Sequence, residues 1–274
     1  MQKRIAGILA AVMIFLTGCS VQTAETTETH TSPTLQTQPT AAQEREVQEE
    51  PEVQEEPETK YRCVSQTQTM ATGTMWQYEY VYDDNGVLRE ALFRKNQDAP
   101  STIVYTLDEK GNILQEVNHS PDDSVSHTTR YRYDEAGNLT EKQLTWAVGG
   151  KTQRTEYVYD DSGRQTQRQS YSNNIPSDRY ETTYLPDGSS AECIRYNGDV
   201  QKDRTVLEFD AEGRLIREKQ YRDSESHYRM TEYSYDGWGN RIRSVTTDGS
   251  GDLEYEYDYQ YKAFVPGTGF AELE

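Results

Sequence analysis

The chain has 274 residues, with 28 basic and 47 acidic side chains and a formal net charge of −19. Only 33% of its residues are hydrophobic, well below the roughly 45–50% of an ordinary globular domain, so one large conventional core is not expected. The negative charge argues against nucleic acid as a partner, because binding phosphates requires basic side chains. All 21 tyrosines lie at or beyond Tyr61, so the composition changes sharply near that point.

Residues 1–18 have the features of a secretory signal peptide. A basic start precedes an apolar run at 5–16, which is shorter than the ~20 residues of a membrane-spanning helix. The run ends in Leu-Thr-Gly-Cys, a sequence that resembles the lipobox of bacterial lipoproteins. The resemblance implies cleavage after Gly18 and a diacylglyceryl group on Cys19, which would anchor an exported protein to a membrane. The alternative is an ordinary signal peptide with an incidental cysteine.

Residues 19–60 are predicted to be a disordered tether. They contain no Tyr, Phe or Trp, and ten acidic residues stand against two basic ones. The hexapeptide EVQEEP occurs twice in tandem. Such a segment cannot bury enough apolar surface to offset the entropy lost on ordering, and its proline and like charges keep it extended.

Residues 61–274 contain an internal repeat with seven turn sequences of the general form Tyr-Asp-x-x-Gly. The positions four and six before each glycine are mostly aromatic and alternate with polar or variable ones, which predicts a strand with one aromatic face. The Asp and Gly favour a hairpin turn, because Asp bonds its own backbone and Gly accepts positive φ. The glycines, spaced 25 or 26 residues apart, are Gly86, Gly111, Gly137, Gly163, Gly188, Gly213 and Gly239.

Each repeat is therefore predicted to be one β-hairpin that pairs edge to edge with its neighbours. The expected fold is all-β: an extended, curling antiparallel meander of about seven hairpins, with an additional strand at each end. The twist of so long a sheet would place the Tyr face on its concave side. Residues 61–72 and 253–265 would cap the two open edges. On such an open sheet, Cys63 and Cys193 would lie too far apart for a disulfide.

Two stretches of the repeat resemble the YD repeats of the RHS family, which also occur in teneurins. They are YEYVYDDNGVL at 78–88 and YRYDEAGNL at 131–139. The resemblance covers the repeat region and implies a curling sheet of β-hairpins, which in that family often forms a hollow shell. It does not imply toxin delivery, because the Asp-Pro-x-Gly core motif of the large members is missing. The fifth repeat also departs from the pattern, since Leu185 replaces the Asp.

No metal, cofactor or catalytic site is predicted. The four histidines match no zinc-peptidase motif, and the chain has no Gly-x-Ser-x-Gly elbow. Acidic residues recur in the turns, where turn chemistry alone explains them. Calcium sites or a pair of carboxylates for glycoside hydrolysis are the alternatives for these residues.

The candidates for ligand binding are the three tryptophans Trp76, Trp146 and Trp238, which the repeat explains least. Trp238 stands between two glycines in a turn where no other repeat has an aromatic residue. The regular tyrosines are expected mainly to stabilise the sheet through cross-strand pairs. Rigid aromatic side chains on an exposed surface can instead stack on sugars or anchor peptides.

The sequence favours a non-enzymatic, extracytoplasmic module that is anchored to the membrane through Cys19. Its hairpin array would be a scaffold or a binding face for a glycan, a cell-envelope component or a protein. Two other classes stay open: a carbohydrate hydrolase that uses turn carboxylates, and a partner or immunity protein of an RHS-type toxin system.

Overall fold

The computed structural model describes residues 60–222, 225–265 and 269–270. The predicted signal peptide, the tether up to residue 59 and Cys19 lie outside the described residues. The predicted lipid anchor therefore stays a prediction.

The described part of the chain consists of seventeen β-strands joined by turns and short loops. In chain order they are β1 (Lys60–Met70), β2 (Met75–Tyr82), β3 (Leu88–Lys95), β4 (Ser101–Leu107), β5 (Ile113–His119), β6 (Val125–Tyr133), β7 (Leu139–Trp146), β8 (Thr152–Tyr159), β9 (Gln165–Ser172), β10 (Ile175–Tyr184), β11 (Ser190–Asn197), β12 (Val200–Phe209), β13 (Leu215–Tyr221), β14 (Arg229–Tyr235), β15 (Arg241–Asp248), β16 (Leu253–Val265) and β17 (Gly269–Phe270).

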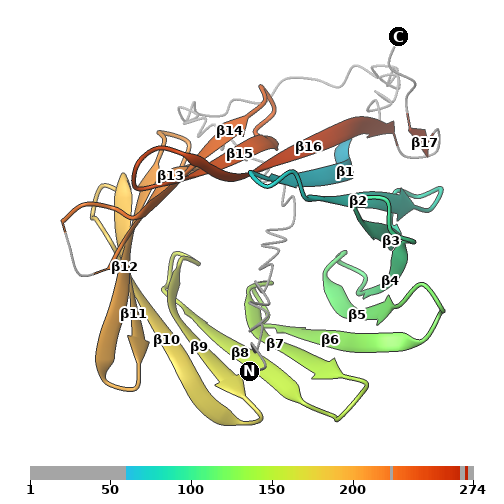
Figure 1. Ribbon diagram of the computed structural model, residues 1–274, viewed down its shortest axis with the longest axis horizontal. Coiled ribbons are helices and arrows are strands. Elements are labelled where there is room, and N and C mark those ends of the chain that lie inside the picture. The colour runs from blue at the N-terminus through green and yellow to red at the C-terminus, as the bar shows by residue number, and fades with distance from the viewer. Residues whose placement is uncertain (1–59, 223–224, 266–268, 271–274) are drawn as a thin grey trace, which may run out of the picture. The chain divides into compact units, whose positions relative to one another are not determined.

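Strands β1 to β16 form a closed antiparallel barrel. Each strand pairs with the next one along the chain, and β1 also pairs with β16, from Lys60↔Phe264 to Met70↔Tyr255. Figure 1 looks into this ring of strands, where blue β1 meets red β16. The short strand β17 adds to the end of β16.

The predicted open meander is therefore wrong, because the sheet closes on itself. Residues 61–72 and 253–265 do not cap two separate edges; their strands pair with each other. The physical reason is that a curling sheet brings its two edges together, and pairing them satisfies backbone N–H and C=O groups that an open edge would leave exposed. Closure does not join Cys63 to Cys193 by a disulfide, since these cysteines lie on β1 and β11.

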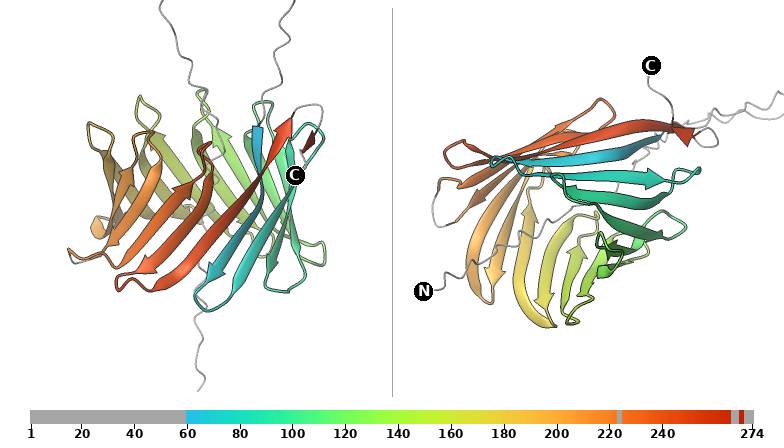
Figure 2. Two further views of the ribbon diagram at one scale, coloured as in Figure 1. Left: turned by 90° about the horizontal axis from the view of Figure 1, so that it is seen from above. Right: turned by 45° about the vertical axis from the view of Figure 1, so that its right-hand side comes forward.

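The seven predicted glycine turns all lie at one end of the barrel, which we call the turn end. The connections between hairpins lie at the other end, the linker end, and Figure 2 shows the strands running obliquely between the two. All seven glycines have positive φ, for example +90° at Gly137. The carboxylate of Asp134 starts this turn and accepts a 2.7 Å hydrogen bond from the Asn138 backbone N–H.

Six of the seven turns are followed by a β-bulge, which the sequence analysis did not predict. In the third repeat Tyr133 pairs with Leu139 and Arg132 pairs with Glu141, so Thr140 is the extra residue. Without this residue, the rest of the return strand would turn its side chains to the opposite face. The turn at Gly188, where Leu185 replaces the Asp, has no bulge. The six extra residues are Arg89, Leu114, Thr140, Thr166, Ile216 and Ile242.

The tyrosine face lines the inside of the barrel, in agreement with the sequence-based expectation. Tyr78 and Tyr105 are buried, and the residues paired with them across the ladders share their face. Apart from Phe264, the buried residues of the described strands all lie on this inner face. They are Gln66, Gln68, Tyr78, Ala91, Ile103, Tyr105, Thr129, Arg168, Ala191, Thr231, Ser244 and Thr246.

Candidate ligand-binding site

Several of the inner tyrosines make hydrogen bonds that stabilise the barrel. Five of the tyrosines that stand four residues before a turn glycine donate a hydroxyl hydrogen bond to a backbone carbonyl near the preceding turn or, for the first, on β1. Burial raises the pKa of Tyr133 and Tyr159 to about 12, so both hydroxyls are protonated donors at neutral pH. The bonds are Tyr82 to Cys63 (2.7 Å), Tyr133 to Ile113 (2.9 Å), Tyr159 to Leu139 (2.9 Å), Tyr184 to Gln165 (3.1 Å) and Tyr235 to Leu215 (2.8 Å).

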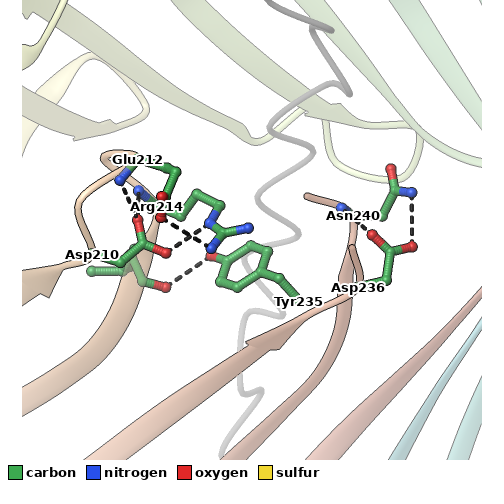
Figure 3. A network of polar contacts seen from close by, with 7 residues as sticks. Asp210, Glu212, Arg214, Tyr235, Asp236 and Asn240 are labelled. Atoms are coloured by element: carbon green, nitrogen blue, oxygen red, sulfur yellow. Dashed lines mark hydrogen bonds and ion pairs between the residues drawn. The ribbon is translucent and has the colours of Figure 1, made fainter. Parts of the chain in front are cut away.

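The turn carboxylates are also engaged in structure. Figure 3 shows Asp210 accepting hydrogen bonds from the backbone N–H of Glu212 and of Arg214, and a 2.7 Å bond from Arg214 Nε. The Arg214 guanidinium in turn lies 5.1 Å from the ring centroid of Tyr235. In another repeat, hydrogen bonds from Asn138 hold the pKa of Asp134 below its usual value. A carboxylate held ionised in this way is a poor general acid for glycoside hydrolysis.

Two carboxyl groups inside the barrel are different, because burial raises their pKa. They belong to Glu116 on β5 and Glu218 on β13, and Tyr233 donates a 2.8 Å hydrogen bond to Glu218. These strands are eight apart in a ring of sixteen, so the two carboxyl groups lie on opposite walls. Hydrolysis of one glycosidic bond needs two carboxyl groups ~5–10 Å apart, which opposite walls do not provide.

The three tryptophans do not form one site. Trp76 on β2 and Trp146 on β7 lie at the linker end on the inner face of the wall. Trp238 lies at the turn end, 70% exposed, with its ring centroid 4.6 Å from that of Tyr61. Trp146 lines a hollow in the protein surface.

The hollow at Trp146 lies at the linker end, between the β5–β6 and β7–β8 loops. Its volume is about 540 Å³, and it is open to the solvent rather than enclosed. The β5–β6 loop and the start of β6 contribute three serines and a valine, and the end of β7 and the β7–β8 loop contribute a tryptophan, a valine and a lysine. These residues are Ser120, Ser124, Val125, Ser126, Trp146, Val148 and Lys151.

The Trp146 ring is held from inside the barrel by His127, with 5.0 Å between the ring centroids. Burial, and then the positive charge of Lys142, lower the pKa of His127, so this imidazole is neutral at neutral pH. Pairing of the two strands aligns these residues, since His127 lies directly opposite Trp146. A fixed aromatic ring beside several hydroxyl groups is an arrangement that suits a polar ligand with an apolar face.

Sequence reasoning identified Trp146 but missed the residues around it. Ser120, Ser124 and Lys151 lie in loops between hairpins, and Ser126 lies at the start of β6, all outside the repeat pattern. No sequence motif marks these residues. The β5–β6 and β7–β8 loops become neighbours only because β6 pairs with both β5 and β7.

The outer face of the barrel wall carries many ion pairs. Arg217 bonds to Glu208 at 2.8 Å and to Glu232 at 3.0 Å, across three neighbouring strands. Arg243 likewise pairs with Glu256. Further outward pairs are Arg132–Glu141, Arg154–Glu156, Arg179–Glu181, Arg204–Glu192 and Lys219–Glu208.

Comparison with known proteins assigns no family to the chain. No protein-family model matches it, and no curated protein matches its sequence, so the resemblance to YD repeats stays a prediction. Solved structures with some likeness include a porin-like protein from Bacteroides uniformis (TM-score 0.49, 11% identity, 72% of this chain and 96% of that one). Another porin-like protein, from Bacteroides vulgatus, has TM-score 0.44 and 10% identity over 73% and 98%. The TcdB2-TccC3 structure has TM-score 0.33 and 13% identity over 73% and 15%.

At these TM-scores and identities, the likenesses assign no function to this chain. The described residues include no helix that is long and apolar enough to span a bilayer.

Proposed function

We propose that the chain is a lipid-anchored, extracytoplasmic binding protein without enzymatic activity, whose barrel is a rigid scaffold for a glycan site at Trp146. The observation that carries this proposal is the hollow of about 540 Å³ in which one fixed aromatic ring stands among serine hydroxyls. Sugars have an apolar ring face and a polar rim, so they stack on aromatic rings and exchange hydrogen bonds with hydroxyl groups.

The charged side chains on the outer face support the proposal that water, and not lipid, surrounds the barrel. A basic side chain near the middle of a lipid-facing strand destabilises a membrane-inserted barrel by about 2–4 kcal/mol. Several strands of this barrel carry Arg or Lys in ion pairs on their outer face. Contact with the membrane is then made through the lipid on Cys19 and not through the barrel wall.

The hollow lies at an end of the barrel, where a large ligand can reach it. Lys60, the first described residue, begins strand β1 at the turn end. The hollow lies at the opposite, linker end, where two surface loops form it. Binding sites are commonly formed by loops on a rigid scaffold, and the closed ladder of hydrogen bonds supplies that rigidity in this barrel.

A glycan array with the full-length protein tests the binding proposal. The wild type and Trp238→Ala are expected to bind the same glycans, since Trp238 lies at the other end of the barrel. Trp146→Ala is expected to lose binding and to have a lower melting temperature, because this half-buried ring packs on His127, while its circular dichroism spectrum at the assay temperature stays that of a folded barrel. Release of reducing sugar from any bound glycan would contradict the non-enzymatic part of the proposal.

Detergent partitioning tests the lipid anchor separately. The wild type is expected to enter the detergent phase and Cys19→Ala to remain in the aqueous phase, because one cysteine carries the lipid. Equal partitioning of the two proteins would show that lipidation of Cys19 is not what attaches the protein to membranes.

A further inference from the structure

We infer that the hollow at Trp146 takes an acidic sugar, of the hexuronic acid type, in preference to a neutral one. This inference deepens the proposed function and rests on it. It starts from the charges of the hollow, because its aromatic ring and hydroxyls would suit either kind of sugar.

Lys151 is the ionised group that lines the hollow, and no carboxylate lines it. Within the described part of the chain, the Lys151 ammonium makes no ion pair, although the chain has almost two acidic side chains for each basic one. The Lys151 backbone is fixed, because its carbonyl accepts a 2.9 Å hydrogen bond from the Trp146 N–H. Lys151, at the end of the β7–β8 loop, is thus held by its backbone to Trp146, at the end of β7.

Two acidic residues lie in the β5–β6 loop, and neither side chain lines the hollow itself. Asp122 accepts hydrogen bonds from the Ser124 backbone N–H at 3.1 Å and from its hydroxyl at 2.7 Å. The side chain of Asp123 is almost fully exposed and lies 3.4 Å from His119. A ligand in the hollow would therefore meet the Lys151 side chain directly, and the Asp122 carboxylate only across Ser124. The wider negative charge of the protein is screened beyond ~8 Å at physiological ionic strength.

Each part of an acidic sugar has a matching group in the lining of the hollow. The Trp146 ring offers a platform for the apolar face of a pyranose, and the Ser120 and Ser126 hydroxyls can exchange hydrogen bonds with sugar hydroxyls. A sugar carboxylate is ionised at neutral pH and pairs with the Lys151 ammonium. Because the lysine is exposed, the pair adds only a modest preference, about two- to fivefold in affinity.

Calorimetry with the full-length protein tests this inference, with a digalacturonic acid and the matching neutral digalactose as probes at about 150 mM salt, near physiological ionic strength. The wild type is expected to bind the acidic disaccharide about two- to fivefold more tightly. Lys151→Met is expected to bind both equally, and Lys151→Arg to keep the preference. The matched control is Lys110→Met, which removes an exposed lysine from a turn at the opposite end of the barrel and is expected to behave as the wild type.

The outcomes separate the inference from the proposed function. Equal binding of the two disaccharides by the wild type, or an unchanged preference in Lys151→Met, would overturn the preference for acidic sugars and leave a neutral glycan site. Absence of binding to either disaccharide and to every glycan on the array, or full binding by Trp146→Ala, would overturn the glycan site itself. Competition by acetate at the same concentration would show that a carboxylate alone is recognised, which also contradicts a sugar site.

Discussion

The hydroxyl of Tyr235 donates a 2.8 Å hydrogen bond to the carbonyl oxygen of Leu215, twenty residues earlier on the strand β13. Four other repeat tyrosines make an equivalent bond, each nineteen or twenty residues back. Phe209 and Leu107 hold the same repeat position and have no hydroxyl. This bond gives tyrosine an advantage over phenylalanine at this position, and the chain has 21 Tyr against 5 Phe.

Tyr235→Phe tests the contribution of this bond. The ring stays in place and the hydroxyl is lost, so the free energy of unfolding is expected to fall by about 1 kcal/mol in urea melts. The matched control is Tyr196→Phe, since Tyr196 uses its ring face under the Arg179 guanidinium, 4.7 Å away. An equal loss in the control would mean that the hydroxyl bond of Tyr235 is not the cause.

Because the barrel is closed, Tyr→Ala substitutions in the middle and at the end of the repeat region are expected to lower the free energy of unfolding equally. Tyr133→Ala on β6 and Tyr259→Ala on β16 are each expected to lower the free energy of unfolding by about 2–3 kcal/mol, because both tyrosines are half-buried inside one ring. Urea melts followed by circular dichroism and by fluorescence should coincide for both variants. A small loss and an early separate transition for Tyr259→Ala would indicate a fraying edge and an open sheet.

Two turn glycines with similar backbone angles differ in their surroundings, and this gives a paired test. A Cβ atom at Gly86 would lie 2.5 Å from Phe264 Cε1, whereas nothing lies within 4 Å of one at Gly137. Both have positive φ, so Gly137→Ala is expected to cost about 1–2 kcal/mol from backbone strain alone. Gly86→Ala is expected to cost more, because the buried Phe264 must also move.

Thermal melts of the two glycine variants check this difference. Combining Gly86→Ala with Phe264→Leu is expected to recover part of the additional loss, since the smaller side chain removes the clash. Equal melting temperatures for the two single variants would contradict the packing of Phe264 against this turn.

The buried carboxyl group of Glu218 predicts a pH-dependent stability. Burial raises its pKa in the folded protein, so folding favours the protonated form. The cost of ionising it is absent below the pKa of the unfolded chain, grows as the pH rises toward the folded pKa, and is complete above it. Glu218→Gln keeps an acceptor for Tyr233 and is expected to raise the urea midpoint more at a pH of about 8 than at a pH of about 4.

The control for this pH experiment is Glu109→Gln, which neutralises an exposed carboxylate in a turn. It is expected to show little difference between its effects at the two pH values. If Glu218→Gln instead lowers the midpoint at the higher pH, the ionised carboxylate stabilises the barrel and burial does not raise the pKa of Glu218.

The sequence by itself determined the local structure of the repeat. The glycines at Gly137 and its six equivalents take the positive φ that the turn pattern predicted, and Asp134 makes the expected bonds to its own turn. These features depend on residues a few positions apart, so their physical causes are contained in short stretches of sequence. The aromatic alternation likewise predicted the inner face of the strands that precede the turns, but not that of the return strands, whose face depends on the bulges.

Tertiary structure alone decided the closure of the sheet and the composition of the candidate site. The pairing of β1 with β16 joins residues about 200 positions apart, and no local pattern specifies it; the accumulated twist of the successive strand pairs does. The pairing of β6 with β5 and with β7 brings the serines at and before the start of β6 beside Trp146 and Lys151. Local chemistry therefore determined the hairpins, the curvature summed over all of them closed the barrel, and the pairing of neighbouring hairpins assembled the residues around Trp146.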